Sequence, residues 1–338
     1  MDNPLSEMID CMTLTPEELA KIAETEWIVR DMIVRGMLHV FPAKYGTGKT
    51  TLCTYLLAPQ AIADGYEVVY INADLAPTQA KTYVEFADKI GMNLLLPGIV
   101  PGTNAMDVSR YLNKMAESKS DYSNQVLFVD TLKKFCDVNK KSSIKQAMDL
   151  FRRLTHRGMT VILVAHTTKH PNDNGDPIYE GTNEVGTEPD NVIMLSGDKD
   201  DNKTIISTTI EKSRAFFNER SYELVWEDNT PQFHEIDYVD LETKQAALNQ
   251  FEEDTKRIEF ISKAMSAGKH SCRGIIEHCR DEVSSRQVKR VLHTYKKNNG
   301  VPGVKELWSV KRIPEQNNSD YYELIRLGGN TGHTARTA

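Results

Sequence analysis

Residues 43–51 read AKYGTGKTT, in which two glycines are followed by a lysine and two threonines. In a loop of this kind, successive backbone N–H groups point inward around phosphate oxygens, and the helix that follows adds the positive end of its dipole. The lysine is placed to reach the β- and γ-phosphates, and the hydroxyl of the first threonine to ligate Mg²⁺. The stretch therefore predicts a site for ATP and Mg²⁺, built from Ala43, Lys44, Tyr45, Gly46, Thr47, Gly48, Lys49, Thr50 and Thr51.

Three other polar side chains stand where apolar runs end. Asp130 ends the run QVLFVD, where a carboxylate is placed to hold Mg²⁺ through water; a helix N-cap is the alternative. Asp74 follows the run EVVYIN, and we expect it to orient and deprotonate the attacking water, with a turn-forming role as the alternative. His166 follows the run MTVILVA, where we expect it to contact the γ-phosphate and to sense its loss.

The elements that must position these residues are apolar segments that alternate with amphipathic ones. We expect strands at residues 37–42, 67–72, 125–130, 159–165 and 191–195, and helices at 49–64, 77–91 and 143–157. Such alternation predicts an α/β fold, with a mostly parallel, twisted sheet flanked by helices on both faces. Ligands of such sheets bind beyond the carboxyl ends of the strands, where the residues above fall. Later strands at 203–210 and 222–226 are expected to be antiparallel.

The chain of 338 residues is long enough for two domains. We expect a lead-in segment at residues 1–36, an ATPase core at 37–237, a helical linker at 238–253, a second domain at 254–327 and a disordered tail at 328–338. In the second domain, we expect helices at 254–266, 271–280 and 284–298, and strands at 306–312 and 321–326. Three helices followed by a hairpin have the outline of a winged-helix domain.

The third helix of this second domain has an apolar face of Val288, Leu292 and Tyr295, which we expect in the core. Its other faces are basic, which suits the major groove of duplex DNA; an interaction module for another protein is the alternative. The residues predicted to contact DNA here are Arg286, Lys289, Arg290, Lys296 and Lys297. Residues 251–338 contribute +5 to a chain whose net charge is -7, and this split favours nucleic acid slightly.

The composition limits where the protein acts. The sequence has no run of about 18 apolar residues, so no membrane span and no membrane partner are expected. The acidic N-terminus lacks the apolar region of a secretory signal. The five cysteines are scattered and odd in number, which fits reduced thiols better than a disulfide framework. We therefore expect a cytoplasmic protein.

The order of these motifs resembles that of the RecA-like hexameric motors, and is most similar to the RepA-type replicative helicases of plasmids and their phage and mobile-element relatives. The matching segments are WIVRDMIVRGMLHVFPAKYGTGKTTL, VLFVDTLKKF, LVAHTTKH and TTIEKSR, within residues 25–235. Ala43 stands at the family's first glycine position, a substitution common among RecA-like proteins. The resemblance implies a RecA-like fold and a homo-oligomer, expected to be a hexamer, that uses ATP and Mg²⁺ to move along single-stranded DNA in a central channel.

The resemblance also implies roles for individual residues. Asp74 stands where the family has a catalytic glutamate one methylene longer, which implies slower hydrolysis, and His166 matches the γ-phosphate sensor. Lys212 and Arg214 match basic residues that a neighbouring subunit inserts into the ATP site to stabilise transition-state charge; a solvated strand edge is the alternative. Basic residues of two channel loops are expected to track the DNA backbone, here Lys133, Lys134, Lys140, Lys141 and Lys169.

Three other functions remain open. Lys44 partly matches the deviant phosphate loop of ParA-type partition ATPases, in which a lysine reaches across a dimer, although Tyr45 departs from that pattern. A RecA-like recombination or annealing factor would form filaments instead of rings. A non-motor initiator or loader would bind duplex origin DNA through the second domain and use ATP as a conformational switch.

Overall fold

The computed structural model describes residues 8–9, 12–13, 15–16, 25–167, 180, 184–200, 202–228, 230–298, 304–313 and 319–325. The chain divides into two compact units, residues 1–239 and 240–338. Among the helices of the described residues, none is both long and apolar enough to cross a membrane. The predicted DNA contact Lys169 and the predicted tail at 328–338 lie outside the described residues.

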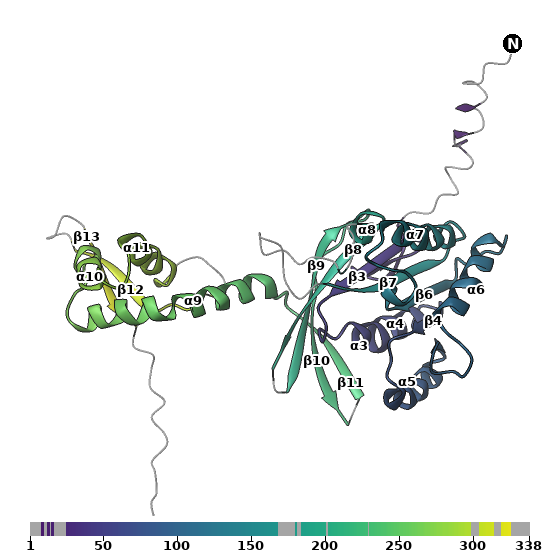
Figure 1. The fold of residues 1–338 in the computed structure, drawn as a ribbon, viewed down its shortest axis with the longest axis horizontal. Helices are drawn as coiled ribbons and strands as arrows, with labels where there is room; N and C mark the ends of the chain where they lie inside the picture. Colours follow the sequence, from purple (N-terminus) through teal and green to yellow (C-terminus); the bar gives the residue numbers. More distant parts are fainter. Residues whose placement is uncertain are drawn as a thin grey trace, which may run out of the picture. The chain divides into compact units, whose positions relative to one another are not determined.

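The first unit is built on a nine-stranded sheet with the order β11-β10-β9-β8-β3-β7-β6-β4-β5 (Figure 1). The strands from β8 to β5 in this order run parallel, whereas β9, β10 and β11 continue the sheet as antiparallel neighbours. Their bounds are β3 Leu38–Ala43, β4 Glu67–Asn72, β5 Asn93–Leu95, β6 Gln125–Asp130, β7 Thr160–His166, β8 Asn191–Lys199, β9 Lys203–Lys212, β10 Ser221–Glu227 and β11 Thr230–Ile236. The predicted mostly parallel α/β sheet with antiparallel later strands is confirmed.

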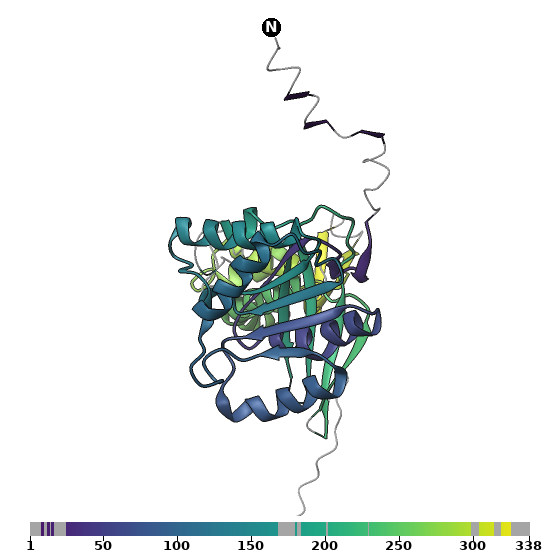
Figure 2. The same cartoon turned by 90° about the vertical axis from the view of Figure 1, so that its right-hand side faces the viewer.

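Helices cover both faces of this sheet, as Figures 1 and 2 show. Two separate apolar clusters lie on the two faces. The first cluster contains residues of α3, α4 and α5, and the second contains residues of α6 and α7. The helix bounds are α3 Lys49–Leu52, α4 Ala58–Ala63, α5 Pro77–Ile90, α6 Ala105–Glu117, α7 Lys141–Thr155 and α8 Glu184–Thr187.

The helix predicted at residues 49–64 is interrupted. Between α3 and α4, residues Cys53–Leu57 form a π-helical turn, labelled η1. Pro59 is the second residue after this turn and has no N–H to donate to the carbonyl of Tyr55, so the regular bonding pattern fails there. The first turn, which carries Lys49 and Thr50, remains α-helical and keeps its N-terminus at the phosphate loop.

The lead-in segment contributes a short hairpin to the first unit. Strands β1 (Trp27–Val29) and β2 (Ile33–Val34) are antiparallel, and Asp31 between them has a positive φ of 59°. The Asp31 carboxylate is fully buried and accepts hydrogen bonds from Arg220 and Asn218. The hydrogen bonds to Asp31 thus fix residues before the predicted core to the segment that leads into β10.

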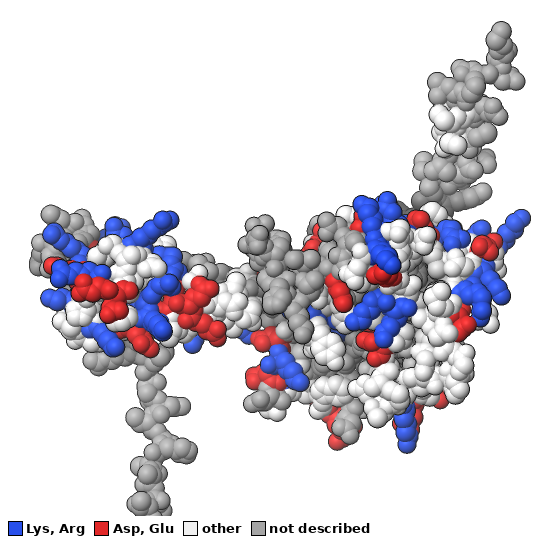
Figure 3. Space-filling model, in the orientation of Figure 1, with Lys and Arg blue, Asp and Glu red and all other residues white. Residues whose placement is uncertain are grey.

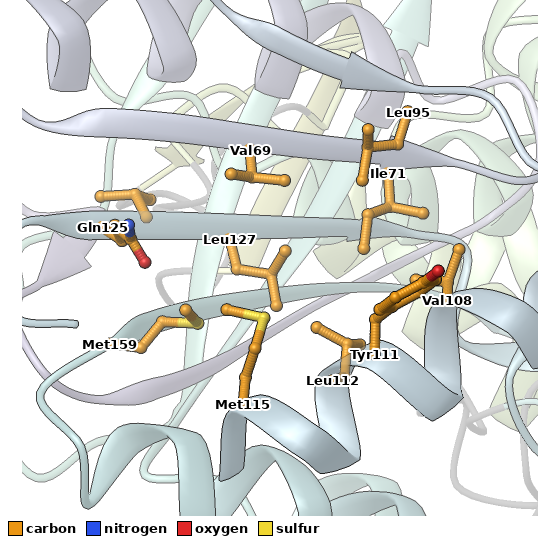
Figure 4. A pocket seen from close by; sticks show the side chains of 11 residues that line it. Val69, Ile71, Leu95, Val108, Tyr111, Leu112, Met115, Gln125, Leu127 and Met159 are labelled. Atoms are coloured by element: carbon orange, nitrogen blue, oxygen red, sulfur yellow. The ribbon is translucent and has the colours of Figure 1, made fainter. Parts of the chain in front are cut away.

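An apolar pocket of about 210 Å³ lies between α6 and the sheet face formed by β4 and β6 (Figure 4). Figure 4 shows Met115, Leu112 and Tyr111 of α6 facing Leu127, Val69 and Ile71 of the strands. The capping box of Asn104 and Asp107 fixes the first turn of α6. The pocket offers no charged group, and it is not where the sequence predicts phosphate chemistry.

The second unit has three helices and a two-stranded antiparallel sheet: α9 Leu241–Ser266, α10 Cys272–Cys279, α11 Ser285–Thr294, β12 Trp308–Ile313 and β13 Ser319–Leu324. Asp240, Ser271 and Ser284 cap the three helices, each by accepting a bond from a backbone N–H of the first turn. The core contains the predicted Val288, Leu292 and Tyr295, together with Trp308, whose indole donates to the carbonyl of Leu292 at 2.8 Å. Helix α9 runs without a break through most of the predicted linker at 238–253.

Candidate nucleotide-binding site

The loop between β3 and α3 has the geometry of a phosphate cradle. Gly46 and Gly48 both have positive φ, at 81° and 97°, where a side chain would be strained. A Cβ at Gly48 would also lie 2.9 Å from the side chain of Ile206 in β9. A Cβ at Gly197 in β8 would lie 3.0 Å from the carbonyl oxygen of Thr47, so β8 packs closely against the loop. The two glycines that the sequence singled out are therefore required by the backbone path.

Lys49 is almost fully buried and is held by the loop that it follows. Its ammonium donates to the carbonyls of Ala43 and Lys44 at 3.1 and 3.0 Å and lies 3.3 Å from Nδ1 of His166. Burial lowers the pKa of Lys49, while the nearby carboxylate of Asp130 raises it. The ammonium is thus held among neutral acceptors at the point where the loop is predicted to receive phosphate.

Thr50 and Asp130 lie together, as the predicted magnesium site requires. The Thr50 hydroxyl donates to Oδ2 of Asp130 at 2.6 Å, and the Tyr70 hydroxyl donates to the same oxygen at 3.0 Å. Burial raises the pKa of Asp130, whereas the bonds from Thr50 and Tyr70 lower it. Tyr70 was not predicted. It lies two residues before Asn72 on β4, so the two side chains share a face of the sheet, and Asn72 is paired with Asp130 on β6. Tyr70 and Asp130 therefore lie on the same sheet face.

The oxygen donors present suit a magnesium–nucleotide complex. A carboxylate and a threonine hydroxyl are hard ligands of the kind that Mg²⁺ prefers. Thr50 and Asp130 would hold the ion, with Lys49 and the loop backbone on the triphosphate. Mg²⁺ bound there would neutralise charge on the β- and γ-phosphate oxygens.

Asp74 and His166 lie at the carboxyl ends of strands that flank Asp130. Asp74 follows β4, and its backbone N–H donates to the side chain of Asn72 at 3.1 Å. Its carboxylate is paired with Lys134 at 3.1 Å. His166 ends β7, and its ring faces that of Tyr45 at an interplanar angle of 28°, with ring centres 6.4 Å apart. Burial is the main cause that lowers the pKa of His166, with Lys49 acting in the same direction.

Four consecutive strands of the sheet therefore end at this site. Strands β3, β7, β6 and β4 are neighbours in that order, and all are parallel. At these carboxyl ends, or just beyond them, lie in the same order the phosphate loop, His166, Asp130 and Asp74. The structure thus brings together all the residues that the sequence predicts for phosphate binding, magnesium binding and water activation.

Lys212 and Arg214 lie farther along the chain and have partners within it. The ammonium of Lys212 donates to the carbonyls of Thr187 and Pro189 at 2.5 and 2.6 Å. Arg214 forms an ion pair of 3.1 Å with buried Asp190 but keeps 61% of its side chain exposed. The Arg214 side chain is therefore anchored at one nitrogen by Asp190 and otherwise largely exposed.

The lysines predicted to bind DNA after Asp130 also form ion pairs. Lys133 pairs with Glu180, Lys134 with Asp74, Lys140 with Asp137 and Lys141 with Glu184. In the second unit, the guanidinium of Arg290 donates to the fully buried carboxylate of Asp254, so it is anchored in the core. Arg286, Lys289 and Lys297 are exposed, and Lys296 is half-buried.

The comparisons with known proteins agree with this geometry over the N-terminal half. The AAA domain family model matches residues 6–172, which include the phosphate loop, Asp74, Asp130 and His166. No curated protein sequence matches the chain.

Two solved structures are similar to the chain at low identity. The chain is similar to the flagellar accessory protein FlaH from Methanocaldococcus jannaschii, with a TM-score of 0.43 and 17% identity over 66% of this chain and 97% of that one. It is also similar to the RadB recombinase, with a TM-score of 0.40 and 16% identity over 59% and 91%. The AAA domain match and the phosphate loop, which follows a parallel strand of the sheet, together support a P-loop ATPase.

Proposed function

We propose that the protein is an oligomeric ATPase that moves along single-stranded DNA and unwinds duplex DNA in the replication of a plasmid, phage or other mobile element. The observation that carries the proposal is the row of four parallel strand ends that hold the phosphate loop, His166, Asp130 and Asp74. Such a row provides phosphate binding, metal binding and a base for water at one edge of a sheet.

Within each subunit, the chain's own residues divide the work. Lys49 leaves its carbonyl partners to bind the β- and γ-phosphates, which the loop backbone surrounds. Asp74 orients and deprotonates the attacking water. His166 lies 3.3 Å from Lys49 and ends β7, so it reports the state of the γ-phosphate to the residues that follow β7 in the chain.

Hydrolysis is completed by a neighbouring subunit in this proposal. Arg214 has an exposed guanidinium, which suits the role of a residue inserted into the next subunit's ATP site. Lys212 is held by two backbone carbonyls and supports the segment that presents Arg214. Such a contact repeats from one subunit to the next, and we propose that the repeat closes as a hexamer.

DNA contacts are proposed in both units. The proposed channel would be lined by basic residues that contact the backbone of single-stranded DNA, namely Lys133, Lys134 and Lys169. The second unit has the element order of a winged helix, and exposed Arg286, Lys289 and Lys297 beside half-buried Lys296 would face duplex DNA. On the face shown in Figure 3, basic and acidic side chains are interspersed, so the proposal rests on α11 and the segment after it, not on a single-sign surface.

A strand-displacement assay tests the motor directly. Lys49→Ala removes the phosphate-binding ammonium, and we expect it to abolish both ATP hydrolysis and unwinding. Lys81→Ala is a matched control, because the exposed Lys81 side chain pairs with Glu85 on α5. Unwinding that survives Lys49→Ala, or is lost equally in Lys81→Ala, would refute the motor.

A partition-type dimer is the second candidate, since the side chain of Lys44 is exposed and free to reach another subunit. Negative-stain imaging with a non-hydrolysable ATP analogue separates the two. Six-fold rings support the helicase, whereas dimers that need Lys44 support the partition protein.

A further inference from the structure

The turn that follows β6 connects two neighbouring strand ends through charge. Residues Leu132–Lys134 form a short 3-10 turn, labelled η2, directly after Asp130. Its two lysines reach carboxylates on either side, because β6 lies between β4 and β7 in the sheet. Lys134 pairs with Asp74 beyond β4, and Lys133 pairs with Glu180, which follows β7 in the chain.

Both carboxylates belong to the catalytic edge of the site. Asp74 is the proposed base for the attacking water. Glu180 donates its backbone N–H to the carbonyl of His166 at 2.8 Å, so it lies next to the proposed γ-phosphate sensor. The charges of this turn also reach the sensor: burial and Lys49 lower the pKa of His166, Lys133 adds to this effect, and Glu180 and Asp74 oppose it.

The pair between Lys134 and Asp74 hinders the base. A carboxylate whose oxygen is 3.1 Å from an ammonium is oriented toward that ammonium instead of toward water. The backbone of Asp74 is fixed by Asn72, so only its side chain has to turn for the pair to open. Breaking this pair therefore changes the base without moving the strand.

The same pair is open to competition from solvent. The side chains of Lys134 and Asp74 are 43% and 39% exposed, and exposed ion pairs contribute little net stability. The phosphates of a nucleic acid attract lysines more strongly, since each contact releases condensed counterions. A DNA strand that contacts Lys133 and Lys134 would thus replace their carboxylate partners with its phosphates.

We propose that Lys134 is a positioning residue that holds Asp74 while DNA is absent, and that the phosphates of bound single-stranded DNA take Lys134 over and release Asp74 to act on water. The inference rests on the proposed ATPase function and adds its regulation by DNA. No bond is made or broken in the exchange; one ion pair replaces another.

The test is steady-state phosphate release from saturating MgATP, with and without oligothymidine. The wild type should be stimulated by oligothymidine, and less so as salt rises. In Lys134→Ala the basal kcat should rise about fivefold, the size expected for loss of an exposed ion pair, and oligothymidine should add little more. The KM for ATP should stay unchanged, because Lys49 and the loop are untouched.

Three controls make the result specific. Lys134→Arg keeps the pair and should behave as the wild type does. Lys81→Ala removes a more exposed lysine, likewise paired with a carboxylate, from α5 and should change neither rate. Sodium phosphate at the same phosphate concentration should not stimulate, since it does not span the turn; equal stimulation by it would overturn DNA as the signal.

The outcomes separate this inference from the function on which it rests. If the wild type hydrolyses no ATP, the proposed ATPase fails. If hydrolysis is present and needs Lys49, but Lys134→Ala keeps the wild-type basal rate and the full stimulation, only the switch fails. A lowered basal rate in Lys134→Ala, or a wild type that oligothymidine does not stimulate, likewise overturns the switch alone.

Discussion

Lys49, Thr50 and Asp130 show how the site keeps its polar groups satisfied before a nucleotide enters. The ammonium of Lys49 has two carbonyl partners, and the hydroxyl of Thr50 has the carboxylate of Asp130. Unpaired polar groups at this burial would cost about 1–3 kcal/mol each. Phosphate and magnesium binding must therefore exchange these bonds for new ones, and the affinity for MgATP reflects the difference.

His39 makes the stability of the first unit depend on pH. Its ring is fully buried in β3 and accepts a hydrogen bond from the N–H of Val34 at 3.1 Å. Burial lowers the pKa of His39 to about 4, whereas in the unfolded chain it is about 6.5. Between these values the unfolded state binds more protons, so stability rises with pH there.

We therefore expect the unfolding free energy of the first unit to fall by roughly 2 kcal/mol from pH 7 to pH 5. Urea denaturation at the two pH values measures it. His39→Gln has no titrating ring and should lose most of this dependence. An equally steep pH dependence in the variant would show that another group is responsible.

At the scale of elements, the strands were easier to predict than what joins them. The strand predicted at 125–130 has those bounds in the structure, and so does the one at 67–72, because buried parallel strands are continuous apolar runs. Helix α6 was missed, although apolar residues recur along it and the capping box of Asn104 and Asp107 marks its start. The hairpin of β1 and β2 was missed because the strands are very short.

The positions of the site residues could also be predicted from the apolar strands, but their ion-pair partners could not. Strand ends identify Asp74, Asp130 and His166, because parallel strands deliver their carboxyl ends to one edge. The ion pair of Asp74 with Lys134 depends on how far the two side chains extend between the segments after β4 and β6. The hydrophobic periodicity of the sequence contains no information on this. Arg290 looked like a DNA contact from its basic neighbours, yet Asp254, which is 36 positions earlier, holds it.

Gly48 tests whether the loop needs glycine for its backbone path or for space. Gly48→Ala faces both a φ of 97° and a Cβ contact of 2.9 Å with Ile206, whereas Gly65→Ala faces a φ of 89° and open space. We expect Gly65→Ala to cost about 1 kcal/mol of stability, and Gly48→Ala to cost more and to raise the KM for ATP. Thermal denaturation and steady-state kinetics measure both. Equal effects of the two variants would mean that the loop tolerates a side chain.

Arg290 separates a structural role in the second unit from a role in DNA binding. Removing it leaves the buried carboxylate of Asp254 with fewer partners, so Arg290→Ala should lower the unfolding free energy of this unit by about 2 kcal/mol. Lys289→Ala, its exposed neighbour, should change it by less than about 0.5 kcal/mol. Urea denaturation followed by tryptophan fluorescence of buried Trp308 reports on the unit. If the two variants are equally stable, the Asp254 contact contributes little.

At the scale of the whole molecule, the two units have separate apolar cores. The chain divides between residues 239 and 240, just before α9 begins. A truncation at residue 251 would instead cut α9 in the middle of the helix. A fragment ending at Val239 should keep basal ATP hydrolysis within about twofold, since every proposed catalytic residue precedes that point. Its affinity for duplex DNA should fall. Phosphate release and fluorescence anisotropy measure the two; unchanged duplex affinity would remove the second unit from the DNA-binding proposal.

The central claim is that Lys49 and its loop hold ATP where Asp130 secures the magnesium, so that hydrolysis takes place at this edge of the sheet. The most direct measurement is MgATP hydrolysis by the full chain, compared between the wild type, Lys49→Ala and Lys81→Ala. The account predicts turnover in the wild type and in Lys81→Ala, and a loss of about 100-fold or more in Lys49→Ala. Turnover in Lys49→Ala equal to that of the wild type would contradict it.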